Sequence, residues 1–240
     1  MQRYFVDTDK DIFELSKDDS YHITKVMRNN LGDKVEVVIN KKLNICEIIN
    51  IGNNVTVKKI EEIETDSELP CHITIAQSLV KEQKMDLILQ KCCELGASEI
   101  IPVNTTRSVV KLDKKEIKKI ERWKKIVKEA SEQSKRVVIP TINEILSVKE
   151  LAKLEYDIKI LCTVNELSTS IKKVLSNDLK DAKIILVIGP EGGFTLEEEK
   201  ILIDSGYVST SFGNRVLRTE TASLYALSII NYILLRWLYG

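Results

Sequence analysis

The sequence predicts an α/β domain with a parallel sheet over residues 71–240, preceded by a small all-β barrel or sandwich over residues 1–69. In the longer part, near-continuous apolar segments alternate with amphipathic helical patterns, which is typical of a parallel sheet covered on both faces. In the shorter part, β-branched runs are separated by turn compositions. The polar stretch 64–70, which ends in Pro70, marks the boundary.

The N-terminal part predicts three short strands and one helix. The runs "KVEVVI" (34–39), "ICEII" (45–49) and "VTVKKI" (55–60) are rich in β-branched residues, and "NKKLN" and "NIGNN" separate them. An amphipathic helix is expected over 19–28. These elements are too few and too short for anything larger than a small barrel or sandwich.

From residue 71 the expected elements alternate in type. Strands are expected over 72–80, 98–103, 157–164, 183–188 and 207–212, and helices over 84–95, 113–134, 168–176, 196–205 and 221–238. The inner face of the first helix should carry Met85, Ile88, Leu89, Cys92 and Leu95. That of the second should carry Ile117, Ile120, Trp123, Val127 and Ala130. Ligands of such sheets bind beyond the carboxyl ends of the strands.

The charge distribution, the cysteine and histidine content and the longest apolar run indicate which partners and sites are compatible with this sequence. The formal net charge of the 240 residues is zero, but residues 81–136 carry 15 Lys and Arg against 9 Asp and Glu, as a nucleic-acid face would. The five cysteines form no C-x-x-C pair and only two histidines are present, so we expect buried free thiols, a cytoplasmic protein and no metal. The apolar C-terminal run of fourteen residues is too short to span a membrane and reads as a buried helix.

The loop "GPEGG" (189–193) follows a strand directly. Thr195 and Glu198 form a T-x-x-E capping box that starts a helix, and the glycines let backbone approach a ligand closely. A tight turn without a ligand would look the same. If a ligand binds, Glu191 with no neighbouring lysine disfavours phosphate and favours a cation, an amine or hydroxyls. The dinucleotide fingerprint G-x-G-x-x-G is absent from this loop.

A second loop, "GNRVLRTETA" (213–222), also follows a strand. Arg215, Arg218 and Glu220 stand within six positions, which exceeds what capping by Thr219 or Thr221 requires and favours function over solvated charges. Apolar strand ends and backbone groups suit an adenine, while carboxylate and carbonyl oxygens suit a sulfonium and an amine. S-adenosylmethionine therefore fits these loops better than ATP or NAD.

Longer motifs carry a resemblance to a known family. "IGPEGGFT" followed by "GNRVLRTETA" resembles the C-terminal signature of the bacterial ribosomal RNA small subunit methyltransferase E family, which methylates uridine N3 in 16S rRNA. "KMDLILQKCCELGASEIIPV", "RSVVK", "EASEQSKR", "RYFV" and "HITKVMRNNLGD" are similar to its upstream motifs, so the resemblance covers nearly the whole chain. Thr106 and Lys135 depart from the family pattern in the part expected to face RNA.

The resemblance implies a fold and a set of partners. Residues 71–240 would form a trefoil-knotted SPOUT methyltransferase domain, and residues 1–69 a PUA-like, RNA-binding β-barrel. The chain would be a homodimer with its C-terminal helix in the interface, and its substrate would be 16S rRNA in the small ribosomal subunit. The two C-terminal loops and the loop after "KILCTV" would hold S-adenosylmethionine through Leu161, Thr163, Gly189, Pro190, Glu191, Gly192, Gly213, Leu217, Arg218, Thr219, Glu220, Thr221 and Ala222.

Roles for charged residues follow from the same resemblance. Arg218, or else Arg215, would stabilise the anion of the target base, and Glu220 would orient an arginine or accept the proton. The expected RNA contacts are Arg3, Arg28, Arg107, Lys111, Lys135 and Arg136. Two alternatives stay open: a SPOUT enzyme that modifies tRNA or a ribose 2′-hydroxyl, and an RNA-binding assembly factor without catalysis.

Overall fold

The computed structural model describes residues 1–65, 67–110, 116–166, 168–175 and 179–239. Contacts divide the chain into two compact units. The first comprises residues 1–68 and 131–138, and the second comprises residues 69–130 and 139–240. The return of 131–138 to the first unit is a feature that the sequence patterns did not indicate. Lys111, one of the expected RNA contacts, lies outside the described residues.

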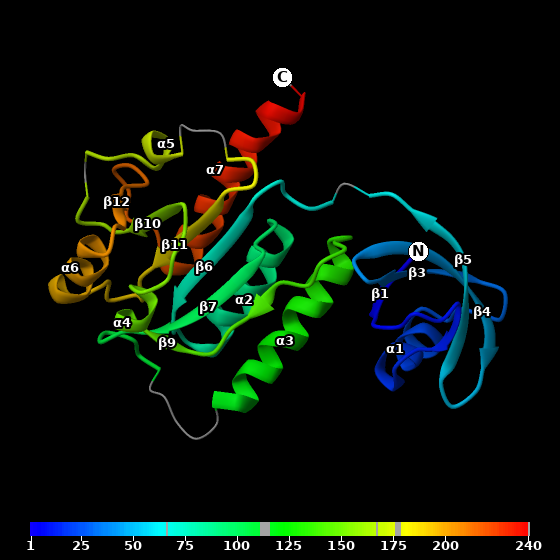
Figure 1. Ribbon diagram of the computed structural model, residues 1–240. Coiled ribbons are helices and arrows are strands. Elements are labelled where there is room, and N and C mark those ends of the chain that lie inside the picture. The colour runs from blue at the N-terminus through cyan, green and yellow to red at the C-terminus, as the bar shows by residue number, and fades with distance from the viewer. Residues whose placement is uncertain (66, 111–115, 167, 176–178, 240) are drawn as a thin grey trace. The chain divides into compact units, whose positions relative to one another are not determined.

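The first unit contains a five-stranded sheet in the order β1-β3-β4-β5-β2 (Figure 1). Its strands are β1 (Arg3–Val6), β2 (Ile12–Glu14), β3 (Lys34–Ile39), β4 (Lys42–Ile51) and β5 (Val55–Ile63). β1 pairs with β3 in parallel and the other neighbours are antiparallel. The expected helix is present as α1 (Lys17–Tyr21), and Ser16 caps its N-terminus. The helix continues as a π-helical turn, η1 (His22–Val26).

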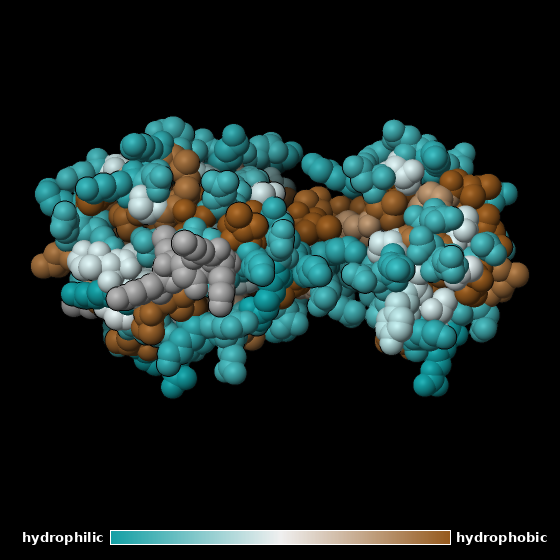
Figure 2. All heavy atoms as spheres, turned by 90° about the horizontal axis from the view of Figure 1, so that it is seen from below, coloured by the Kyte–Doolittle hydropathy of each residue, from teal (hydrophilic) through white to brown (hydrophobic). Residues whose placement is uncertain are grey.

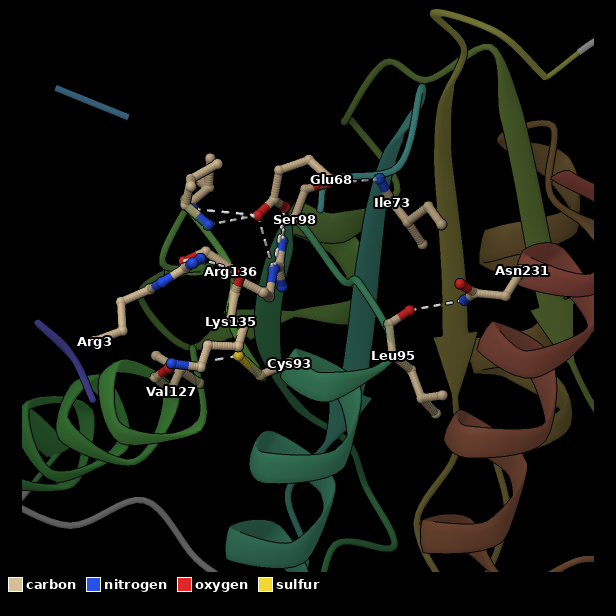
Figure 3. Close-up of polar contacts among 12 residues, drawn as sticks. Arg3, Glu68, Ile73, Cys93, Leu95, Ser98, Val127, Lys135, Arg136 and Asn231 are labelled. Atoms are coloured by element: carbon tan, nitrogen blue, oxygen red, sulfur yellow. Dashed lines mark hydrogen bonds and ion pairs between the residues drawn. The ribbon is translucent and has the colours of Figure 1, made fainter. Parts of the chain in front are cut away.

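Residues 131–138 are held in the first unit by packing and by two arginines. Val137 packs with Val38 and Leu43 of the sheet. Arg136 Nη2 lies 2.6 Å from Glu68 Oε2, and Arg3 donates to the carbonyls of Lys135 and Arg136 (Figure 3). Arg3 also donates to Glu36 at 2.9 Å.

These contacts correct the prediction that Arg3 and Arg136 touch RNA. Their residues are only 4% and 3% exposed, and each guanidinium already has a carboxylate partner. Moving Arg136 to a phosphate would take a buried cation from Glu68, and moving Arg3 would leave Glu36 with Lys135 alone, so either move is costly. Both arginines therefore act structurally.

The second unit is built on a parallel sheet in the order β12-β10-β11-β6-β7-β8, with β9 also paired to β7. Every pairing among its described strands is parallel. Its strands are β6 (His72–Ser78), β7 (Glu99–Asn104), β8 (Thr141–Ile142), β9 (Leu146–Ser147), β10 (Ile158–Cys162), β11 (Lys183–Ile188) and β12 (Val208–Thr210). The predicted α/β class is confirmed, and among these strands only the short β8 and β9 were not anticipated.

Helices cover both faces of this sheet (Figure 1). They are α2 (Glu82–Glu94), α3 (Glu116–Gln133), α4 (Val148–Leu151), α5 (Ile171–Val174), α6 (Leu196–Asp204) and α7 (Thr219–Tyr239). One core holds Ile184 and Leu186 of β11 together with residues of α2, α3, α5 and α7. The other holds Ile185 and Val187 together with residues of α4 and α6. Successive residues of a strand point to opposite faces, so β11 is buried on both sides.

The predicted helix faces are largely confirmed. Met85, Ile88, Leu89 and Cys92 of α2 are buried, as are Trp123, Val127 and Ala130 of α3. The prediction for Ile117 is wrong, because this residue is 74% exposed. It lies in the first turn of α3, before the packed face begins at Ile120. All five cysteines are buried and free, as predicted.

On the face seen in Figure 2, hydrophilic residues cover most of both units and hydrophobic patches interrupt them. Within the described part of the chain, no helix is long and apolar enough to cross a bilayer. The same residues contain no cluster of His, Cys, Asp or Glu suited to a metal ion.

Candidate cofactor and active site

A cavity of about 460 Å³ opens beyond the carboxyl ends of β10, β11 and β12. This is the edge at which parallel sheets bind ligands. Three loops line it: residues 163–165 after β10, 189–194 after β11 and 211–219 after β12. Its apolar walls come from Cys162, Ile188, Phe194, Phe212, Val216, Leu217 and Ala222.

The loop after β11 has the local structure that its glycines predict. Thr195 caps α6 by accepting from the Glu198 amide, while the Glu198 carboxylate accepts from the Thr195 amide at 2.9 Å. Gly193 has a φ of +66°, a conformation that disfavours other residues. A Cβ at Gly189 would lie 3.1 Å from the ring of Phe194, so a side chain there would require the ring to shift by a few tenths of an ångström.

A chain of buried hydrogen bonds joins this loop to the loop after β12. The Thr219 hydroxyl donates to the Gly189 carbonyl at 2.7 Å, and Gln77 Nε2 donates to the Thr219 hydroxyl at 2.9 Å. The Ser223 hydroxyl donates to Gln77 Oε1 at 2.6 Å. Gln77 and Ser223 are fully buried. Gln77, at the end of β6, is thus a site-forming residue that sequence reasoning missed.

Glu191 at the tip of the first loop has a cation beside it. Lys84 Nζ of α2 lies 3.0 Å from Glu191 Oε1 and 3.5 Å from Glu220 Oε2. The Glu191 hydrogen bond raises the pKa of Lys84 above its ordinary value. Burial alone would raise the pKa of Glu191, but hydrogen bonds from its own amide and from Lys84 lower it overall. The loop itself contains no lysine, so this cation comes from a segment that is distant in the sequence.

Arg107 supports the same loop from the segment after β7. Its Nη1 donates to the carbonyls of Gly192 at 3.0 Å and Phe194 at 3.1 Å, and its side chain lines the cavity. Its neighbour Thr106 donates from its amide and its hydroxyl to Glu198 Oε1, at 2.7 and 3.0 Å. Residues expected to face RNA thus support the glycine loop.

The loop after β10 is anchored on α6. The Thr163 hydroxyl donates to Glu199 Oε1 at 2.5 Å, and Asn165 Nδ2 donates to both Glu199 oxygens at 3.1 Å. Thr163 and Asn165 line the cavity. Leu161 does not, because it is fully buried in the core beneath α4 and α6, on the opposite side of its strand from Ile160 and Cys162. Its predicted place at the cofactor is therefore corrected.

Comparison with known proteins identifies the family. The model of the RNA methyltransferase domain family matches residues 67–231. The ribosomal RNA small subunit methyltransferase E of Bacillus subtilis is 38% identical, over 97% of this chain and 96% of its own length. The chain belongs to the ribosomal RNA small subunit methyltransferase E family. The resemblance inferred from the motifs is thereby confirmed.

Solved structures of the methyltransferase E family and its relatives agree. The Neisseria gonorrhoeae ribosomal RNA small subunit methyltransferase E, bound to S-adenosyl methionine, superposes with a TM-score of 0.88 at 27% identity over 97% of this chain and 98% of its own. A Legionella pneumophila methyltransferase with bound cofactor SAM gives a TM-score of 0.89 at 29% identity, covering 96% of this chain and 97% of its own.

Most residues that the family motifs pointed to lie together at the cavity. The lining includes Thr163, Gly189, Pro190, Glu191, Gly192, Gly213, Leu217, Arg218, Thr219 and Ala222. Arg215 also lines it, and both Arg215 and Arg218 are exposed. Glu220 and Thr221, in the first turn of α7, are not part of the lining.

The expected RNA contacts of the family are scattered. Arg28 is exposed on the first unit, with a φ of +56° just after η1. Lys135 is half exposed and lies 3.0 Å from Glu36. Arg107 is at the cavity. Among the six predicted RNA contacts, Arg28 is an exposed residue of the first unit, and this exposure is compatible with a contact to RNA.

Proposed function

We propose that this chain methylates N3 of a uridine in 16S rRNA of the small ribosomal subunit, with S-adenosylmethionine as methyl donor. The observation that carries the proposal is the cavity closed by the loops 189–194 and 211–219, in a chain of the methyltransferase E family. Two solved relatives that superpose over nearly the whole chain bind this cofactor.

The residues present suit the cofactor. The cavity lies within the roughly 300–1,000 Å³ range of small-molecule sites, and its aromatic and aliphatic walls match an adenine. Glu191 and the loop carbonyls provide acceptors for an amine. The bound donor would supply an electrophilic methyl group on a sulfonium.

The chemistry requires an acid–base step before transfer. Uridine N3 loses its imide proton, its lone pair bonds the methyl carbon, and the carbon–sulfur bond breaks to leave S-adenosylhomocysteine. Alignment of N3 with the methyl supplies a large part of the rate enhancement. A guanidinium at O2 or O4 would stabilise the uridine anion. We assign this role to Arg218, which is exposed at the cavity.

The surroundings of Glu220 support a positioning role for this residue. Its side chain is 14% exposed, does not line the cavity, and has Lys84 as its described charged neighbour. We propose that Glu220 positions the second loop and that solvent accepts the imide proton.

Three further expectations belong to the same proposal: the trefoil knot in residues 71–240, the PUA-like character of residues 1–69, and a homodimer. A non-sequential strand order, with β11 between β10 and β6, supports the knot. The exposed stripe of Tyr225, Ser228 and Tyr232 on α7, at helical spacing, supports an interface on that helix. A ribosomal substrate places the activity in the cytoplasm.

Methyl transfer from labelled cofactor tests the function. Isolated small subunits and naked 16S rRNA are incubated with the chain, and the labelled nucleoside is identified after digestion. Labelled 3-methyluridine is the expected product. A labelled 2′-O-methyl nucleoside, or labelling of tRNA only, would favour another SPOUT activity, whereas cofactor-independent RNA binding without transfer would favour an assembly factor.

A further inference from the structure

Lys84 occupies an unusual position between the two cofactor loops. It lies in the first turn of α2, whose Met85 and Ile88 are buried in the core, so the backbone that carries Lys84 is fixed. Its ammonium group lies 3.0 Å from Glu191 and 3.5 Å from Glu220. One cation of α2 therefore meets a carboxylate of the loop after β11 and a carboxylate of the first turn of α7.

The two carboxylates belong to different segments at the cavity. Glu191 is at the tip of the loop after β11 and lines the cavity. Glu220 is the second residue of α7, directly after the lining residue Thr219. Without Lys84, two carboxylates that share one neighbour would face each other, and like charges at such a distance repel. The ammonium group removes this repulsion and gives both loops a common anchor.

The geometry differs from that of an ordinary surface ion pair. Lys91, two turns further along α2, pairs with Glu94 at 2.8 Å within the same helix, and such exposed pairs contribute little. The side chains of Lys84 and Glu191 are 31% and 30% exposed, close to the 39% and 33% of Lys91 and Glu94, but Lys84, Glu191 and Glu220 belong to three separate segments. The contacts of Lys84 therefore constrain loop positions relative to each other, which those of Lys91 cannot do.

We propose that Lys84 is a positioning residue of the cofactor site: by holding Glu191 and Glu220 it fastens the two loops in the arrangement that binds S-adenosylmethionine. This inference rests on the proposed function, because it presupposes the same cofactor in the same cavity. Lys84 acts through the loops, so its loss should weaken cofactor binding more than it slows transfer at saturating cofactor.

The test compares three variants by calorimetry with S-adenosylmethionine, after melting curves establish that each is folded. Lys84→Met should raise the Kd by about tenfold or more, or about 1.4 kcal/mol. Lys84→Arg, which keeps the charge and the reach, should stay within about threefold of the wild type. Lys91→Met, the matched control on the same helix, should leave the Kd unchanged. In steady-state assays, Lys84→Met should raise the KM for cofactor with a smaller change in kcat.

A double-mutant cycle separates positioning from general stability. If Lys84 acts through Glu191, then Lys84→Met combined with Glu191→Gln should bind little worse than the weaker single variant, because the lost interaction is the same. A Kd of Lys84→Met equal to that of the wild type, or strictly additive effects in the cycle, would overturn the inference while leaving the proposed function intact. Absence of binding by the wild-type chain would instead overturn both.

Discussion

The hydroxyl of Thr219 donates a 2.7 Å hydrogen bond to the carbonyl of Gly189, which joins the first residue of α7 to the loop after β11. Because Gln77 donates to the same hydroxyl from inside the sheet, the contact is buried and fixed. Thr219→Val keeps the shape but removes the donor to the Gly189 carbonyl and one of the two acceptors of Gln77 Nε2, which keeps its bond to the Ser78 carbonyl. We expect a loss of about 1–3 kcal/mol in unfolding free energy and weaker binding of S-adenosylmethionine.

Thr219→Ser is the matched control, because it restores the hydroxyl at the cost of one methyl group. Chemical denaturation and calorimetry measure both effects. Equal cofactor affinity in Thr219→Val and the wild type would show that this bond does not shape the cavity.

Arg218 and Arg215 both line the cavity, but the proposed mechanism assigns the chemistry to Arg218. Arg218→Ala should lower the single-turnover rate of methyl transfer by about a hundredfold or more, as removal of one stabilising donor does elsewhere. Its cofactor Kd should change little. Arg215→Ala is the comparison variant. If Arg215→Ala loses the rate and Arg218→Ala does not, then Arg215 and not Arg218 stabilises the uridine anion.

Glu99, the first residue of β7, accepts several hydrogen bonds in a half-buried cluster at the amino end of the sheet, away from the cavity. It accepts from Thr74 at 2.7 Å, Asn143 at 2.6 Å and Tyr156 at 3.0 Å, with His72 at 3.3 Å. Burial alone would raise the pKa of Glu99, but these hydrogen bonds outweigh it and lower the pKa. The stabilisation is therefore present at neutral pH, above the ordinary carboxyl pKa, and is lost as the pH falls through the lowered value.

Glu99→Gln should destabilise the protein by about 2 kcal/mol at pH 7, and the difference from the wild type should shrink towards pH 3. Denaturation curves at several pH values measure this. Glu155→Gln, at a highly exposed neighbouring site, should show no such trend. A difference that stays constant with pH would contradict the assigned role of the ionised carboxylate.

Two arginines of the first unit should behave differently. Arg28 is exposed, so Arg28→Ala should weaken binding to small-subunit rRNA and reduce the salt dependence of log K by roughly 0.7–0.9. Arg136 is buried against Glu68, so Arg136→Met should instead cost about 3 kcal/mol of stability by taking the cation from a carboxylate that would keep the Val137 and Val138 amides as donors. Filter binding across salt concentrations, together with thermal melts, distinguishes them. An unchanged salt slope in Arg28→Ala would exclude a phosphate contact there.

Local features of this molecule could be predicted well from the sequence. The Thr195–Glu198 capping box and the buried face of α2 depend on residues three or four positions apart, so periodicity and spacing reveal them. The two loops that line the cavity were found for the same reason, since each is a contiguous run after an apolar strand.

Contacts between distant segments could not be predicted in this way. Lys84 meets Glu191, and Gln77 meets Thr219, only because the sheet order brings β6 next to β11. No spacing rule encodes that neighbourhood. The same limit explains the error over Arg136: a motif arginine looked available for RNA until the fold placed Glu68 against it.

The structure of this chain crystallised with S-adenosylmethionine tests the central claim most directly. The account predicts density for the cofactor in the cavity, with its adenosine between residues 189–194 and 211–219. The methyl group of the cofactor should face Arg218. Density for the cofactor at another site, or an unchanged empty cavity at saturating concentration, would contradict it.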